Sequence, residues 1–328
     1  MRIVLFHPVL LPPRDYGGVE RVVQWLAQGL LERGHEVHIA ALAGSILPLG
    51  CHLIEVDRRS FSAVELMKIL PKGVDLIHFM APVSEEIWDN LFVPKLLTVH
   101  GNGKLGEKFP KNSVFLSDSH ARLHGASCFI YNGINPDEYL FSPDQKKSWY
   151  LFLSKTHWRV KNLSGTMKFC RKAKVSLKIA GGSRPFFNRM MCWFQPHFEW
   201  IGPVSGVKKA YYLAHAKALL FPVRWPEPFG LVIAEALISG TPVVGFPRGS
   251  LVELIPPEVG VLLESEDEWI RLLEEGTLLA DPERCRQWAL EKFHYRGMAE
   301  NYERIYQQIF QGRILHEVYP RGLGWNLM

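Results

Sequence analysis

The sequence predicts an α/β protein with two Rossmann-like domains that face each other, each built on a parallel sheet. Short apolar strands alternate with helical patterns through the first half of the chain, as is typical of a parallel sheet with crossover helices. The stretch Tyr131–Pro143, YNGINPDEYLFSP, is rich in turn-forming residues, and the alternation starts again after it. A length of 328 residues suits two domains of about 150 residues each. We therefore expect one domain over residues 1–135 and a second that starts at residue 136.

The first domain is expected to open with a strand, a loop that contains two glycines, and a helix. The helix is predicted over Gly17–Gly34 because Val22, Leu26 and Leu30 fall on one face. The expected strands are Arg2–Phe6, Glu36–Ala40, Leu53–Val56, Leu76–Phe79, Lys95–Val99, Ser113–Leu116 and Cys128–Tyr131, with helical patterns in much of the sequence between them.

The second domain is expected to repeat the same alternation. The expected strands are Trp149–Ser154, Leu177–Ala180, Glu199–Ile201, Ala218–Phe221 and Pro242–Gly245. The expected helices are Asn162–Lys174, Val207–His215, a helix that starts at Pro228, Glu266–Leu279, Pro282–Phe293 and Met298–Phe310. A short tail, residues 313–328, follows the last helix.

The composition is that of an ordinary globular protein, with 47% hydrophobic and 22% charged residues. No apolar run reaches the roughly 18–20 residues that a membrane span needs. The first residues, MRIVLF, read as a strand rather than a signal peptide, because prolines and an aspartate follow them. The five cysteines are scattered without a CxxC pair, which favours free thiols over a cysteine zinc site. These features predict a cytoplasmic protein.

Positive charge is concentrated in one part of the chain. The net charge is +5, and the stretch from Gln145 to Phe198 contains many Lys and Arg but no Asp or Glu. Such a segment indicates either an anionic partner or a solvated helix face. Within it, Ser183–Phe198 interleaves arginines with aromatic residues, and could dock on an anionic membrane or form a packed helix. No RNA-binding pattern occurs, so we expect no nucleic-acid partner.

The segment EPFGLVIAEALISGTPVV, Glu227–Val244, carries the strongest functional signal. It places Glu227 and Glu235 eight positions apart, or roughly 12 Å if the chain is helical from Pro228. That distance is too long for the acid and nucleophile of a glycosidase. A helix N-terminus between them offers N–H groups and a positive dipole to an anion. Carboxylates that bind hydroxyls on either side of an anion suggest a sugar nucleotide. No GxGxxG or Walker motif points to another nucleotide enzyme.

The two glutamates, their spacing and the GTPVV that follows resemble the donor site of glycosyltransferase family 4, retaining enzymes of the GT-B architecture. The early stretch GGVERVVQWLAQGLLERGHEVHI resembles the opening loop and helix of the same family. The resemblance implies an acceptor domain over 1–135, joined by the tail 313–328, and a donor domain over 136–312.

The resemblance also implies roles for residues of the second domain. Glu227 would orient the hexose and Glu235 would hold the ribose hydroxyls. Lys161 would bind the donor diphosphate, while Lys155 stands where the family usually has an arginine and Arg159 is an alternative second cation. Phe229, Gly230 and Leu231, at the expected helix start, complete the predicted donor-binding set.

Three residues of the first domain are further candidates. Gly17 and Gly18 follow the first strand, where glycines let the backbone approach a donor phosphate. His100 ends a predicted strand, and ligands of such sheets bind beyond the carboxyl ends of strands. The resemblance places this histidine near the reacting sugar, so the expected catalytic residues are His100, Glu227 and Lys161.

We therefore expect an enzyme that moves a hexose from a nucleoside diphosphate sugar to a hydroxyl of a lipid, glycan or small molecule. Family frequency favours a UDP-sugar over a GDP-sugar. No DxD-type constellation stands out, so we expect no metal and no cofactor besides the donor substrate. The alternative is a non-catalytic protein of the same fold that binds a sugar nucleotide or an anionic glycan.

Overall fold

The structure is a computed structural model that describes residues 1–13, 17–57, 61–182, 197–277 and 279–322. Contacts between Cα atoms divide the chain into two units. The first unit is Met1–Ile134 together with the chain from Phe293 onward, and the second is Asn135–Lys292. Each unit is described by itself below.

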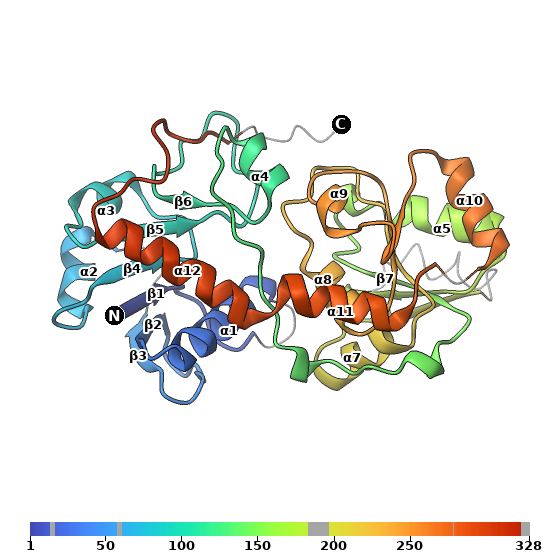
Figure 1. Ribbon diagram of the computed structural model, residues 1–328, viewed down its shortest axis with the longest axis horizontal. Helices are drawn as coiled ribbons and strands as arrows, with labels where there is room; N and C mark the ends of the chain where they lie inside the picture. Colours follow the sequence, from blue (N-terminus) through green and yellow to red (C-terminus); the bar gives the residue numbers. More distant parts are fainter. Residues whose placement is uncertain (14–16, 58–60, 183–196, 278, 323–328) are drawn as a thin grey trace. The chain divides into compact units, whose positions relative to one another are not determined.

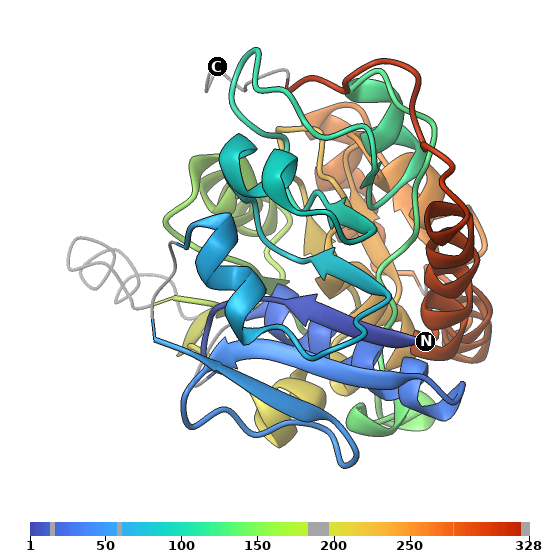
Figure 2. The same cartoon turned by 90° about the vertical axis from the view of Figure 1, so that its left-hand side faces the viewer.

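The first unit is a six-stranded parallel sheet in the order β3-β2-β1-β4-β5-β6 (Figure 1). Its strands are β1 Arg2–Phe6, β2 Glu36–Leu42, β3 His52–Val56, β4 Leu76–Phe79, β5 Lys95–Thr98 and β6 Ser113–Val114. Its helices are α1 Gly18–Glu32, α2 Ala63–Ile69, α3 Glu85–Asn90, α4 Asp118–Leu123 and α12 Tyr295–Phe310. Figure 2 shows β1, β2 and β3 side by side, with β3 at the edge of the sheet.

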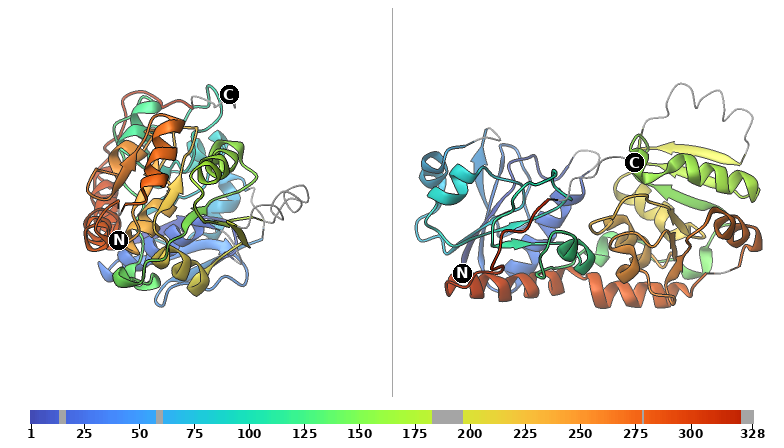
Figure 3. Two further views of the ribbon diagram at one scale, coloured as in Figure 1. Left: turned by 90° about the vertical axis from the view of Figure 1, so that its right-hand side faces the viewer. Right: turned by 90° about the horizontal axis from the view of Figure 1, so that it is seen from above.

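Helices cover both faces of this sheet because its central strands β1 and β4 are mostly apolar on both faces. Val4 and Phe6 pack in one core with Leu66 of α2 and Ile87 of α3. On α1, Gly29 allows a close approach to α12, since a Cβ there would come within 2.6 Å of the Ala299 Cβ. The right-hand view of Figure 3 shows α12 beside α1.

A buried network of polar side chains ties α12 to the sheet. His78 of β4 shares hydrogen bonds of 2.7 Å with the hydroxyls of Tyr306 and Thr98. Thr98 of β5 in turn shares a 2.8 Å hydrogen bond with the Tyr302 hydroxyl. Because the network holds α12, the chain rejoins the first unit at Phe293. Of the C-terminal part of the chain, the bounds expected from the sequence placed only the tail 313–328 in the first domain, whereas α12 also belongs to the first unit.

The second unit also contains a six-stranded parallel sheet, in the order β12-β11-β10-β7-β8-β9. Its strands are β7 Tyr150–Leu153, β8 Leu177–Ala180, β9 Phe198–Gly202, β10 Leu219–Phe221, β11 Val243–Gly245 and β12 Gly260–Leu262. Its α-helices are α5 Leu163–Lys172, α7 Gly206–His215, α8 Leu231–Ile238, α9 Leu251–Leu254, α10 Glu266–Glu275 and α11 Pro282–Phe293. Short 3₁₀ turns occur at Pro136–Glu138, Pro143–Gln145 and Arg159–Lys161.

Two sequence-based assignments of elements are wrong. Cys128–Tyr131 is not a strand, because it makes only one isolated bridge, between Phe129 and Phe115. The predicted helix start at Pro228 is three residues too early, since α8 begins at Leu231. Strand β12 was not predicted at all, because its three residues give no periodic signal. The α/β class and the paired parallel sheets are confirmed.

The buried His78 predicts an acid-sensitive first unit. Burial, with a smaller effect of His100, holds the pKa of His78 well below its usual value. The unfolded chain therefore binds a proton at His78 below about pH 6.5 while the folded chain does not, so stability falls as the pH drops. When the pH falls from 7 to 5.5, the unfolding free energy of the wild type should drop by about 1 kcal/mol more than that of His78→Gln.

Urea titrations followed by circular dichroism at the two pH values measure this difference. The exposed His157 supplies the matched control, because His157→Gln should keep the wild-type pH dependence. Equal losses in the wild type and in His78→Gln would show that His78 does not carry the effect.

Candidate functional site

The candidate site lies at the carboxyl ends of two neighbouring strands of the second sheet. Strands β7 and β10 pair in parallel through Leu151 and Leu219, and the chain order reverses between them. Open α/β sheets bind ligands beyond the strand ends at such a switch point. The loop after β7 carries Lys155 and Lys161, and the loop after β10 carries Glu227.

The backbone around Lys161 is fixed by a helix cap. Lys161 ends the 3₁₀ turn, and Asn162 adopts a left-handed conformation with φ of 58°. The Asn162 side chain accepts a hydrogen bond of 3.2 Å from the Gly165 N–H and so caps α5. The Arg224 N–H donates to the Val160 carbonyl at 2.8 Å, which joins the loops after β7 and β10. These contacts bring Lys161 toward Glu227.

Lys161 and Glu227 form a buried ion pair. The Lys161 Nζ donates to the Glu227 Oε2 at 2.5 Å, and each side chain is only 9% exposed. The Trp225 indole N–H donates to the same oxygen at 2.5 Å. The ammonium also lies 5.1 Å from the ring centroids of Trp225 and Phe221, within cation–π range. An ammonium has three donors, so Lys161 can bind a further anion while it contacts Glu227.

The loop Pro247–Ser250 holds the segment around Glu227 in place. The Ser250 N–H donates to the Glu227 carbonyl at 2.9 Å, and the Ser250 hydroxyl donates to the Phe229 carbonyl at 3.1 Å. Gly249 has φ of +58°, and a Cβ there would lie 2.4 Å from the Glu227 nitrogen. A glycine is therefore required for this close approach.

Helix α8 starts directly after the ion pair. Gly230 is its N-cap with φ of 74°, a left-handed conformation that glycine adopts without strain. This conformation is not helical, so Glu227 and Phe229 precede the helix, and the helix from Pro228 on which the 12 Å estimate depended does not form. Gly230 has no capping side chain, and the Ile233 N–H donates to the Gly230 carbonyl at 2.8 Å, so the first two amides of α8, those of Leu231 and Val232, are the ones that can bind an anion.

Glu235 lies within α8 and is held by two residues that the sequence did not single out. Its Oε1 accepts a hydrogen bond of 2.9 Å from the Tyr139 hydroxyl and forms an ion pair with Lys209 of α7. All three residues are buried. A buried carboxylate needs such partners, because desolvation of an unpaired charge is costly.

Lys155 is separate from the ion pair. Its Nζ lies 4.3 Å from the Trp158 ring centroid, and the Trp158 ring contacts that of Trp225 at 6.2 Å. Glycines let β8 pass close to this loop, since a Cβ at Gly181 would lie 2.1 Å from the Ser154 carbonyl oxygen. Lys155 is therefore placed on the same loop as Lys161, beside the aromatic residues that surround the ion pair.

The remaining candidates belong to the first unit. His100 lies two residues after the end of β5, and its Nε2 is buried with no hydrogen-bond partner among the described residues. Burial, with a smaller effect of His7, lowers the pKa of His100 to about 3, so its imidazole is neutral. Gly17 is the N-cap of α1 and Gly18 its first residue. A Cβ at Gly17 would lie 2.5 Å from Pro13, so only glycine fits.

Sequence reasoning missed Trp225, Lys209 and Tyr139. Trp225 stands two positions before Glu227 and could have been noticed in the sequence. Lys209 and Tyr139 are 26 and 96 positions from Glu235, and only the fold brings them together. The segment Ser183–Phe198, considered for membrane docking, lies almost wholly outside the described residues. Within the described parts of the chain, no helix is long and apolar enough to cross a membrane.

Comparison with known sequences identifies the second unit. Residues 149–275 match the family described as Glycosyl transferases group 1. An uncharacterized 41.2 kDa protein in the cps region of Klebsiella pneumoniae is 32% identical over 152 residues, which cover 44% of this chain and 41% of that protein. The uncharacterized glycosyltransferase MJ1607 of Methanocaldococcus jannaschii is 26% identical, with 76% of this chain and 81% of that protein covered.

Comparison with solved structures identifies the fold of the whole chain. AviGT4, a glycosyltransferase involved in avilamycin A biosynthesis, matches with a TM-score of 0.77 and 24% identity, covering 96% of this chain and 99% of that one. Anabaena Alr3699/HepE, solved in complex with UDP and glucose, matches with a TM-score of 0.66 and 15% identity over 93% of this chain and 98% of that one. The chain therefore has the fold of GT-B glycosyltransferases, and its residues 149–275 match a glycosyl transferases group 1 domain.

Proposed function

We propose that this enzyme transfers a hexose from a UDP-sugar to an acceptor hydroxyl, with retention of the anomeric configuration. The observation that carries the proposal is the contact between Lys161 and Glu227, beside the N-terminus of α8 and at the switch point of the second sheet. A cation and helix amides suit a diphosphate, and a neighbouring carboxylate suits sugar hydroxyls, so this contact supports the proposal. The complexes of HepE with UDP-glucose and with UDP and glucose support the choice of donor.

The chemistry breaks the bond between the anomeric carbon and the diphosphate and forms a bond to the acceptor oxygen, whose proton leaves. Negative charge grows on the departing diphosphate. Lys161, the first-turn amides of α8 and a second cation, Lys155 or Arg159, stabilise that charge. Because these groups supply positive charge at the diphosphate, we propose that the transfer needs no metal ion.

The carboxylates position the two ends of the donor. Glu227 accepts hydrogen bonds from the hexose, and Lys161 and Trp225 fix its orientation. Glu235 accepts from the ribose hydroxyls, while Tyr139 and Lys209 fix its Oε1.

His100 binds a sugar hydroxyl as a neutral imidazole, and the loop at Gly17 and Gly18 approaches the donor phosphate. The first domain supplies the acceptor site, and the acceptor class is a lipid, a glycan or a small molecule.

A donor screen tests the proposal as a whole. Purified protein is melted with a panel of UDP-sugars and GDP-sugars, since a ligand of the folded state raises the melting temperature. We expect a UDP-sugar to give the largest shift and to be slowly hydrolysed without an acceptor, also in the presence of EDTA. Binding without turnover under any acceptor would favour a non-catalytic binding protein.

Removal of the Lys161 ammonium should slow the chemical step. We expect Lys161→Ala to lower kcat by about 10²–10³, because it removes one donor to the transition state. UDP release from the preferred donor measures the rate. Lys172→Ala, which removes an exposed lysine of α5, is the matched control and should keep the wild-type rate. Full activity of Lys161→Ala would remove Lys161 from the mechanism.

Glu235 should matter for donor binding rather than for the rate. We expect Glu235→Ala mainly to weaken donor affinity, measured by calorimetric titration of UDP. Unchanged affinity would refute the ribose assignment.

Variants of the buried pair Lys209–Glu235 distinguish an effect on donor binding from an effect on the stability of the fold. Lys209→Met leaves a buried carboxylate without its cation and should cost about 3–5 kcal/mol of unfolding free energy. The double variant Lys209→Met/Glu235→Gln removes both charges, and should recover most of that stability but not the affinity for UDP. Denaturant titrations measure the first quantity and calorimetry the second. Recovery of both would show that Glu235 does not bind the donor.

A further inference from the structure

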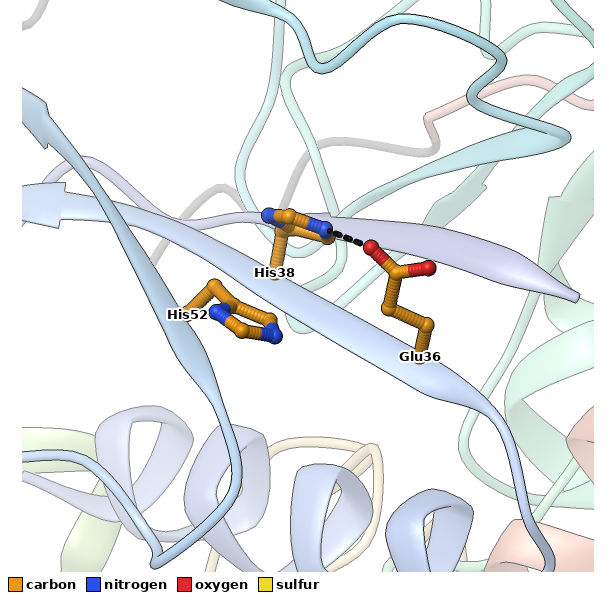
Figure 4. A group of neighbouring side chains, drawn as sticks. All are labelled: Glu36, His38 and His52. Carbon is orange, nitrogen blue, oxygen red and sulfur yellow. Dashed lines mark hydrogen bonds and ion pairs between the residues drawn. The ribbon is translucent and has the colours of Figure 1, made fainter.

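A group of possible metal ligands lies at the edge of the first sheet. Glu36 and His38 belong to β2, and His52 belongs to the edge strand β3. In the parallel register His38 pairs directly with His52, and Glu36 lies two positions earlier on the same face as His38. Figure 4 shows the two imidazoles on adjacent strands, with Glu36 next to His38.

The donor atoms of the three side chains are close enough to share one ion. One ligand atom from each of the three side chains lies within 4.8 Å of the other two. Within the described parts of the chain, no other three His, Cys, Asp or Glu residues come this close together. Tetrahedral Zn²⁺ with bonds of about 2.0–2.2 Å places its ligands about 3.4 Å apart. Small side-chain rotations therefore suffice to close the site around an ion.

Contacts in the structure already hold two of the ligands in place. His38 Nε2 and Glu36 Oε1 share a hydrogen bond of 2.8 Å, and the rings of His38 and His52 stack at 4.7 Å. A metal ion can replace the proton between Nε2 and Oε1, since neutral imidazole can carry its proton on Nδ1 instead. Partial exposure of the Glu36 and His38 side chains, 40% and 13%, leaves room for an ion and its water to enter.

Two charged groups beside the cluster act on a bound cation in opposite directions: the Glu36 carboxylate favours it and the Arg2 guanidinium competes with it. The hydrogen bond from Arg2, together with that from His38, lowers the pKa of Glu36 to about 2, so this ligand is ionised at any working pH. Arg2 is also a competitor, because its Nε donates to Glu36 Oε1 at 2.8 Å. Its guanidinium has a second partner in the Lys72 carbonyl, and its backbone N–H donates to Asp75. Arg2 can thus release one carboxylate oxygen and stay bound.

The ligand types select the class of metal. Two imidazoles and one carboxylate suit Zn²⁺ and its neighbours Co²⁺, Ni²⁺ and Cu²⁺, whereas Mg²⁺ and Ca²⁺ prefer oxygen ligands throughout. Cys51 precedes His52 but is not a member of this group of ligand atoms.

We propose that Glu36, His38 and His52 bind one divalent ion of the Zn²⁺ class, with water in the remaining position. The ion connects the edge strand β3 to β2 and so stabilises the exposed edge of the first unit. The inference does not rest on the proposed function.

The test uses the whole chain without a histidine tag, titrated calorimetrically with Zn²⁺ and, in absorbance, with Co²⁺. We expect one ion per chain, a visible Co²⁺ spectrum typical of nitrogen and oxygen ligands, and a higher melting temperature with Zn²⁺. His38→Ala and His52→Ala should each weaken binding at least about tenfold, and Glu36→Gln should weaken it as well.

Two matched controls separate a built site from adventitious binding. His157→Ala, which removes an exposed histidine elsewhere, and Cys51→Ala should both bind Zn²⁺ like the wild type. The proposal is overturned if the wild type binds no stoichiometric ion, or if His157→Ala loses as much affinity as His38→Ala and His52→Ala.

Discussion

The account depends on one buried ion pair, Lys161 with Glu227. A lysine and a carboxylate removed from water must contact each other, because either one alone would cost several kcal/mol in desolvation. The parallel strands β7 and β10 deliver the two side chains to the same end of the sheet. The Asn162 cap and the close approach at Gly249 then fix the backbone on either side. In the proposed mechanism a diphosphate meets a cation and helix amides that are already in position, which is how preorganised sites stabilise developing charge.

Much of the fold could be predicted because the strands are short, apolar and separated by helical patterns. Strands Arg2–Phe6, Leu76–Phe79 and Leu177–Ala180 and the helix Pro282–Phe293 have the predicted bounds. Each is bounded by a clear change of pattern, such as the Gly-Gly after Ala180. The positions of Lys161 and Glu227 after two strands were also visible in the sequence, and neighbouring parallel strands bring such positions together.

Features that depend on tertiary contacts could not be predicted. The left-handed conformation of Gly230 delays the start of α8, although Pro228 favours an earlier one. The partner of Glu235 is Lys209, a residue that in the sequence resembles any other lysine of an amphipathic helix. Glu36, His38 and His52 form a cluster only through the register of β2 with the edge strand. In each case the signal lies in the pairing of distant elements rather than in local sequence.

The most direct test of the central claim is a crystal structure of the protein with a UDP-sugar. The account predicts diphosphate density within hydrogen-bond distance of the Lys161 Nζ and the first amides of α8, with the hexose against Glu227 and the ribose against Glu235. A nucleotide sugar bound elsewhere, with Lys161 and Glu227 making no contact to it, would contradict the account.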